Sequence, residues 1–177
     1  MAYTFLESNI EDNENLLKKK YENLSYSKVL KKDGESRYVY LLENGVIKKK
    51  YNNRNKKDLA KFENEIKTLN KLRDCPFVPK ILALDIEQLI IYMDNCGYSL
   101  DLLDPSIYKN KLHEINTKMR MLEEKWGLVK YKKITNHGIN NPYTDSNNLC
   151  KNICLKDNRI FIVGFGSTSW KEKNNKN

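Results

Sequence analysis

The chain has 177 residues, of which 40% are hydrophobic and 31% are charged. This length suits about one domain, and the balance is typical of a globular protein rather than a fibrous one. The longest purely apolar runs, such as Ile81–Leu84, are far shorter than the roughly 20 residues of a membrane span. The N-terminus also lacks the pattern of a signal peptide. We therefore expect an intracellular protein, cytoplasmic rather than secreted, with no membrane span.

The net charge is +9, from 32 Lys and Arg residues against 23 Asp and Glu residues. A basic chain suits nucleic acid, anionic membranes or acidic proteins as partners. The chain also contains 23 asparagines, and joint lysine and asparagine excess is typical of AT-rich genomes. No predicted strand interleaves basic and aromatic residues, and no recognition helix is evident. The charge alone therefore indicates no function.

The four cysteines, Cys75, Cys96, Cys150 and Cys154, form no CxxC pair. Zinc sites need four ligands at close spacing, and no second pair or nearby histidine completes a set around Cys150 and Cys154. We expect free, buried thiols in a reducing compartment and no zinc site.

The predicted elements alternate between two periods. The turn signals Asp33-Gly34 and Asn44-Gly45 separate β-rich stretches, and Leu59, Phe62 and Ile66 recur at helical spacing. In chain order we predict a helix over 11–21, strands over 26–30, 37–42 and from 46, a helix over 57–73, strands over 78–85 and 88–93, a helix over 105–126, and strands over 152–155 and 159–163. Clustered strands of this kind indicate an α+β fold.

Two motifs resemble the phosphate-contacting elements of protein kinases. Val46–Lys48 is similar to the motif of the third kinase strand, whose lysine contacts the nucleotide phosphates. Glu65 lies on the following helix and is similar to the glutamate that forms an ion pair with that lysine. The resemblance implies that Lys48 and Glu65 lie within ion-pair distance, either for nucleotide binding or as a purely structural strand–helix contact.

Further residues resemble the rest of a kinase nucleotide site. Met93, Asp94 and Cys96 fall where the last strand and hinge of the first lobe would meet adenine, with Met93 as gatekeeper. Gly34 and Val39 match one glycine and the valine of the glycine-rich loop. The other two glycines are replaced, so close approach of this loop to phosphates is not favoured.

The metal-binding motifs are altered. Asn152 resembles the asparagine that follows the catalytic loop, and is the candidate metal ligand that remains. Gly164–Gly166 resembles the metal-binding turn, but Gly164 stands where kinases have the aspartate. A glycine side chain offers no ligand atom, so a nucleotide-bound Mg²⁺ would lose its main carboxylate.

Three alignments of the catalytic aspartate remain open, and none of them finds an aspartate. Counting back from the asparagine that follows the loop gives Asn147, and counting forward from residues 127–129 gives Lys132. Aligning His137 with the histidine of related kinases gives Ile139. An amide, a lysine or an isoleucine cannot take the substrate proton as an aspartate does. Asp145, the only acid between 135 and 152, is the candidate substitute if the loop is rebuilt.

The order and spacing of these motifs over residues 26–166 resemble the protein-kinase superfamily. The resemblance implies a polar extension over 1–25 and an N-lobe over 26–95, with a five-stranded antiparallel sheet and one main helix. A truncated, mostly helical C-lobe over 96–170 and a disordered tail over 171–177 would follow.

The altered motifs favour a pseudokinase. We expect a catalytically impaired module, compact and lysine- and asparagine-rich as in a viral protein, that binds a kinase or a host regulatory protein. One alternative is a divergent serine/threonine-type phosphotransferase that uses ATP and Mg²⁺. Another is a basic nucleic-acid-binding protein on an unrelated scaffold. Metal-dependent ATP binding separates the first two, and steep salt dependence of nucleic-acid binding identifies the third.

Overall fold

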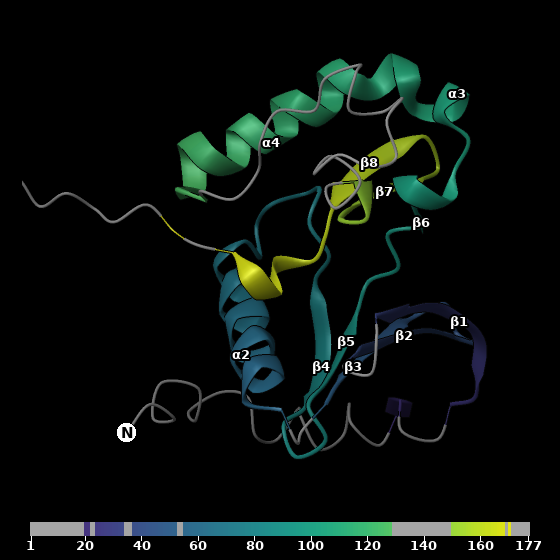
Figure 1. Cartoon of the computed structure of the whole chain (residues 1–177), viewed down its shortest axis with the longest axis vertical. Coiled ribbons are helices and arrows are strands. Elements are labelled where there is room, and N and C mark those ends of the chain that lie inside the picture. The colour runs from purple at the N-terminus through teal and green to yellow at the C-terminus, as the bar shows by residue number, and fades with distance from the viewer. Residues whose placement is uncertain are drawn as a thin grey trace, which may run out of the picture. The chain divides into compact units, whose positions relative to one another are not determined.

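The computed structural model describes residues 20–21, 24–33, 37–52, 55–128, 150–168 and 170. Most of the predicted helix over 11–21 and the whole tail over 171–177 lie outside these residues. Contacts divide the chain into a first unit, Met1–Ile66 with Lys80–Asn95, and a second unit, Lys67–Pro79 with Cys96–Asn177. Figure 1 labels the elements of both units.

A five-stranded antiparallel sheet forms the first unit, in the order β1-β2-β3-β5-β4. The strands are β1 (Tyr26–Asp33), β2 (Arg37–Leu42), β3 (Ile47–Tyr51), β4 (Ile81–Asp85) and β5 (Ile90–Met93). The turn between β2 and β3 needs a left-handed residue, which Gly45 supplies with a φ of 81°. The predicted α+β class and the five-stranded antiparallel sheet are confirmed.

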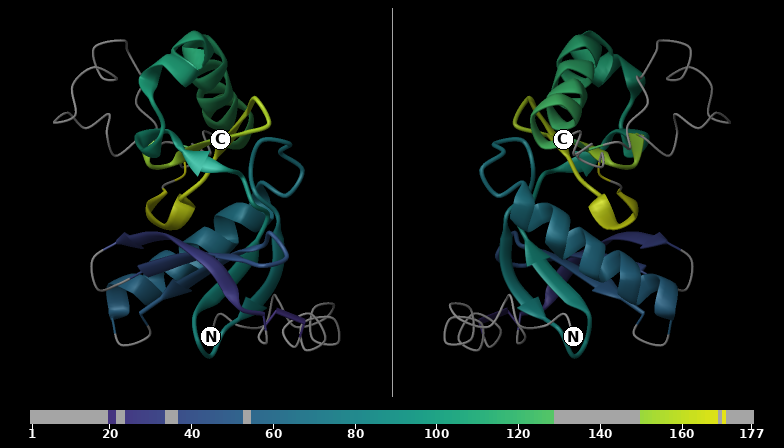
Figure 2. Two further views of the ribbon diagram at one scale, coloured as in Figure 1. Left: turned by 90° about the vertical axis from the view of Figure 1, so that its right-hand side faces the viewer. Right: turned by 90° about the vertical axis from the view of Figure 1, so that its left-hand side faces the viewer.

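The helix α2 (Lys56–Lys71) follows β3. Asn55 caps it, because its Oδ1 accepts a hydrogen bond from the Lys57 backbone N–H at 2.9 Å. Phe62 and Ile66 are buried at helical spacing. Figure 2 shows α2 along one face of the sheet. The Phe62 ring of α2 meets the Tyr51 ring of β3 edge to face, with centroids 5.7 Å apart.

A three-stranded antiparallel sheet, β6 (Tyr98–Ser99), β7 (Ile153–Lys156) and β8 (Arg159–Ile162), forms part of the second unit. Asp157 and Asn158 join β7 to β8 with φ angles of 47° and 61°, as a tight two-residue hairpin requires. At Gly97, before β6, φ is 85° and an added Cβ would lie 2.2 Å from the Leu155 carbonyl oxygen. Only glycine allows β6 this close to β7.

The single helix predicted over 105–126 is instead two helices. Here α3 (Pro105–Tyr108) and α4 (Leu112–Trp126) flank a 3₁₀ turn over Lys109–Lys111. The break follows from Tyr108, whose φ of −120° and ψ of 1° leave the helical region. Gly127 ends α4 in the left-handed conformation, at the predicted end of the helix over 105–126. Two 3₁₀ helices, η1 (Leu100–Leu102) and η3 (Phe165–Ser167), complete the described elements.

Lys118 ties α4 to the rest of the second unit. Its Nζ donates hydrogen bonds to Glu114 Oε1 at 2.7 Å and to the Ile160 carbonyl oxygen at 2.9 Å. The same Nζ lies 5.3 Å from the centroid of the Phe77 ring. Burial raises the pKa of Glu114, but hydrogen bonds and charge from Lys118 and then Lys111 outweigh burial and lower that pKa overall.

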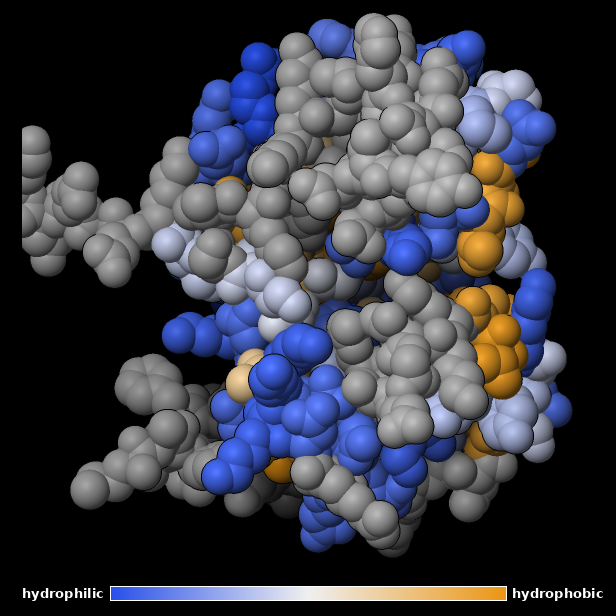
Figure 3. Space-filling model, in the orientation of Figure 1, coloured by the Kyte–Doolittle hydropathy of each residue, from blue (hydrophilic) through white to orange (hydrophobic). Residues whose placement is uncertain are grey.

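On the face shown in Figure 3, hydrophilic residues predominate and hydrophobic residues gather in small groups. Among the described residues, no helix combines the length and apolar character needed to cross a membrane.

All four cysteines are free and buried, as the sequence predicted. They all belong to the second unit. Burial, and next the charge of Asp101, raises the pKa of the Cys150 thiol. This thiol therefore stays protonated and unreactive around neutral pH.

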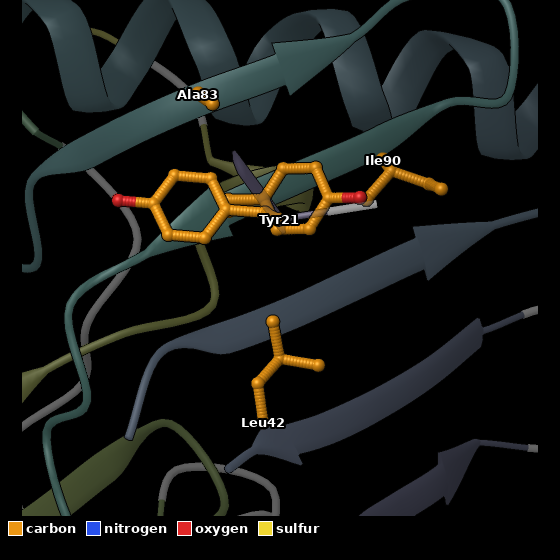
Figure 4. Packing of buried hydrophobic residues seen from close by; sticks show 5 residues of the cluster. Tyr21, Leu42, Ala83 and Ile90 are labelled. Carbon is orange, nitrogen blue, oxygen red and sulfur yellow. The ribbon is translucent and has the colours of Figure 1, made fainter. Parts of the chain in front are cut away.

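A hydrophobic cluster covers the β4–β5 end of the other sheet face, away from α2. Tyr21 stacks on Tyr92 with ring centroids 5.2 Å apart, and Leu42, Ala83 and Ile90 complete the cluster. Figure 4 shows these residues in front of the sheet with α2 behind it. All four residues of β5, between β3 and β4, are therefore buried.

Candidate functional site

A buried ion pair joins β3 to α2. Lys49 Nζ donates hydrogen bonds to Glu65 Oε1 at 2.7 Å and Oε2 at 2.5 Å. The Tyr51 hydroxyl donates to the same carboxylate. Glu65 is 1% exposed, so two side chains from one strand hold a charge that water barely reaches.

The predicted partner of Glu65, Lys48, is wrong by one residue. Successive side chains of a strand point to opposite faces, and Ile47, Lys49 and Tyr51 are the buried set in β3. Lys48 lies on the other face, with its Nζ 5.8 Å from the centroid of the Tyr92 ring. The two-residue period of a strand indicates Lys49 instead, because Lys49 lies two residues from both Ile47 and Tyr51 and therefore on their face.

Val39, a predicted nucleotide-binding residue, shares the face of Lys49. The β2–β3 register places Val39 directly opposite Lys49, and directly opposite residues of a pair share a face. Val39 is half-buried there. Gly34, the other predicted loop residue, lies outside the described residues.

The predicted hinge residues lie at and beyond the end of β5. Met93 is buried opposite Ile47 of β3. Asp94 is tied to Lys80, because its Oδ2 accepts from the Lys80 N–H at 3.0 Å and its own N–H donates to the Lys80 carbonyl oxygen at 3.1 Å. Cys96 is buried and begins the next segment of the second unit. Contact of these residues with adenine stays a prediction.

The two predicted metal-site positions, Asn152 and Gly164, are neighbours in the second unit. The backbone N–H of Val163 donates to the Asn152 carbonyl oxygen at 2.8 Å. Gly164 has a φ of 78°, and a Cβ added there would lie 2.2 Å from Asn152 Oδ1 and 2.9 Å from its Cγ. The Asn152 side chain therefore occupies the space that an aspartate at position 164 would need.

These residues do not fit a magnesium ion. Mg²⁺ requires near-octahedral oxygen coordination, usually with one or two carboxylates. Gly164 supplies no side-chain oxygen, and Asn152 supplies only an amide. Within the described ranges, no three His, Cys, Asp or Glu residues are grouped to hold a metal. The predictions for Lys132, Ile139, Asp145 and Asn147 concern positions outside those ranges.

Three elements of the second unit that are consecutive along the chain each carry an exposed apolar side chain. Tyr98 on β6, Leu102 on η1 and Ile107 on α3 are exposed by 49%, 61% and 51%. Single exposed apolar residues are normal, and these three lie within ten positions of the chain, so we choose this segment to test for a protein contact. They were not singled out in the sequence, because their periodicity does not distinguish them from core residues.

Comparison with known proteins assigns no family to the chain. No model of a known protein family matches it, and no curated protein is significantly similar. Its function is therefore inferred from two contacts: the buried Lys49–Glu65 pair and the Asn152–Gly164 neighbours.

Proposed function

We propose that the chain is a catalytically impaired, protein-kinase-like module that acts by binding another protein. The observation that carries this proposal is the contact at position 164. There, the Asn152 side chain fills the space that a side chain at position 164 would need. The resemblance aligns this position with the metal-binding aspartate of a working kinase.

The Lys49–Glu65 pair supports the kinase-like part of the proposal. In kinases a lysine of the third strand is held by a glutamate of the following helix, and it then contacts the nucleotide phosphates. Here the pair joins the third strand to the helix that follows it, with an Nζ–Oε2 distance of 2.5 Å. Buried ion pairs are often no more stabilising than hydrophobic replacements, so stability alone does not account for this one.

The loss of the metal ligand supports the impaired part. Kinases use Mg²⁺ to bridge the phosphates, and a carboxylate holds the ion. At position 164 a carboxylate would require both a left-handed non-glycine residue and a displaced Asn152. General acid–base assistance contributes about 10²–10⁴-fold, and none of the three alignments supplies a catalytic aspartate.

Nucleotide binding and phosphate transfer test the proposal together. Thermal melting is measured with ATP, with ATP and Mg²⁺, and with Mg²⁺ alone, because a ligand that binds only the folded state raises the melting temperature. We expect no additional shift when Mg²⁺ accompanies ATP, and no transfer of radiolabelled phosphate to generic acceptors. Transfer that is lost in Lys49→Arg and kept in Lys48→Arg would show that the chain is an active kinase.

The exposed apolar residues provide a separate test of partner binding. We expect a double variant, Leu102→Asp with Ile107→Asp, to lose proteins that co-purify with the wild-type chain. Met121→Asp is the matched control, because Met121 is also exposed but lies on α4. Equal recovery of partners by wild type, control and double variant would remove the support from this surface.

A further inference from the structure

Three tyrosines gather on the face of the first unit's sheet that lies away from α2. Tyr26 comes from β1, and Tyr38 and Tyr40 come from β2. The centroids of Tyr26 and Tyr40 are 5.1 Å apart, and those of Tyr38 and Tyr40 are 6.0 Å apart and stacked. Tyr26 is 62% exposed, and Tyr38 and Tyr40 are half-buried. The three rings therefore form one partly open aromatic platform.

Two lysines continue the same face. Across β2 and β3, Tyr38 lies directly opposite Lys50, and Tyr40 lies directly opposite Lys48. Residues directly opposite in a pair share a face, so each ring on β2 has a lysine beside it. The sequence alone does not indicate this arrangement, because the tyrosines lie on β1 and β2 whereas the lysines lie on β3.

The face formed by these tyrosines and lysines has a boundary on its β5 side and carries no negative charge from Tyr40. Its β5 side ends at the cluster where Tyr21 covers Tyr92. Burial, followed by the proximity of Tyr38 and Tyr26, raises the pKa of Tyr40, so its hydroxyl stays neutral and does not repel phosphates. The whole chain carries a net charge of +9.

We propose that this tyrosine–lysine surface, made of Tyr26, Tyr38, Tyr40, Lys48 and Lys50, binds single-stranded nucleic acid. Unpaired bases stack on aromatic side chains displayed by a sheet, while lysines neutralise the phosphates between them. An acidic peptide would use the lysines but would leave the three rings without stacking partners. The inference is independent of the proposed kinase-like function, because Lys49 and Glu65 lie on the α2 side of the sheet.

Fluorescence anisotropy with a labelled 20-nucleotide single strand of mixed sequence, as DNA and as RNA, tests the proposal. We expect Tyr26→Ala to weaken binding about 5- to 150-fold, the range of one lost base–ring stack. Because Tyr26 is largely exposed, its variant should melt as the wild type does. Lys48→Gln with Lys50→Gln should reduce the slope of log Kd against log salt by about 1.4, since each phosphate contact contributes about 0.7.

The matched control is Lys57→Gln with Lys67→Gln, which removes the same charge from exposed positions on α2. We expect this control to bind nearly as the wild type does. The proposal is overturned if the control and the surface variant weaken binding equally, or if Tyr26→Ala binds unchanged. Equal affinity for duplex DNA, equal displacement by polyglutamate of the same length, or no binding at 50 mM salt would also overturn it.

Discussion

Two lysine–glutamate pairs, one in each unit, share one Nζ–Oε1 distance but differ in their surroundings. The Nζ–Oε1 distance is 2.7 Å in both Lys49–Glu65 and Lys118–Glu114. The side chains of the first pair are 11% and 2% exposed, whereas those of the second are 20% and 37% exposed. A distance alone therefore does not indicate what an ion pair contributes to stability.

Access of water to the two pairs sets how much each one contributes to stability. In the partly exposed pair, water screens the attraction and can replace a lost partner, so such a pair contributes about 0–1 kcal/mol. In the buried pair, removing one partner leaves a charge that water cannot solvate, and the cost rises to about 3–5 kcal/mol. We therefore expect that removing one partner of the ion pair lowers the free energy of unfolding more in the first unit than in the second.

The largest expected effect comes from Lys49→Met. This variant leaves Glu65 buried with only the Tyr51 hydroxyl as a described partner, and we expect it to lower the free energy of unfolding by about 3–5 kcal/mol. Urea denaturation followed by circular dichroism measures the change. Lys48→Met, the adjacent lysine on the other face, should cost less than about 1 kcal/mol.

A double variant, Lys49→Met with Glu65→Leu, distinguishes a lost attraction from a stranded charge. Because it removes both charges, it should recover most of the stability lost by Lys49→Met alone. If Lys48→Met and Lys49→Met cost the same, the assignment of the buried lysine is wrong.

An intermediate effect is expected from Gly164→Ala, at a contact that involves no charge. The left-handed backbone there costs a non-glycine residue about 1–2 kcal/mol, and the new Cβ would also collide with the Asn152 side chain. We expect a total loss of about 1–3 kcal/mol by the same denaturation measurement. In an Asn152→Gly background the loss should shrink to the backbone part, and an unchanged loss would show that the side-chain collision is unimportant.

Glu114→Gln should have a smaller effect that depends on pH. The folded-state pKa of Glu114 lies below the ordinary value of 4.5, so the ionised carboxylate stabilises the fold above pH 4.5. We expect a loss of about 0.5 kcal/mol at pH 7. The difference from wild type should vanish as the pH falls through the lowered folded pKa, and a difference that grows on acidification would contradict the assigned direction.

Salt should produce the smallest effect and separate the two pairs once more. Raising NaCl from 0.05 M to 1 M should remove a few tenths of a kcal/mol from the contribution of Glu114, because exposed charges are screened. The cost of Lys49→Met should barely change over the same range. Equal salt sensitivity of the two pairs would indicate that water reaches Glu65.

Local patterns predicted most of the fold. The turn at Asn44-Gly45, the helical spacing of Phe62 and Ile66, and the left-handed stop at Gly127 each act within a few residues, so they can be read from sequence. The two residues of β6 could not be found in this way, because that strand depends on the close approach that Gly97 permits to β7.

The candidate site was predicted less well, for a physical reason. Three successive lysines, Lys48–Lys50, follow Val46 and Ile47, and the spacing of the motif selected Lys48, whereas the face that each side chain adopts selects Lys49. The contact between Asn152 and Gly164 depends on the β7–β8 pairing, and the tyrosine–lysine surface depends on the β2–β3 register. Each is a non-local property that residue spacing along the chain does not carry.

The buried thiols allow local opening of the second unit to be measured through their reactivity. An exposed thiolate attacks a thiol-specific, electrophilic reagent, so a cysteine within a closed structure reacts only when that structure opens. Because all four cysteines lie in the second unit and none lies in the first, pulsed labelling with mass detection counts openings of one unit alone. The opening rate of the second unit can therefore be measured in the native chain, without an introduced cysteine.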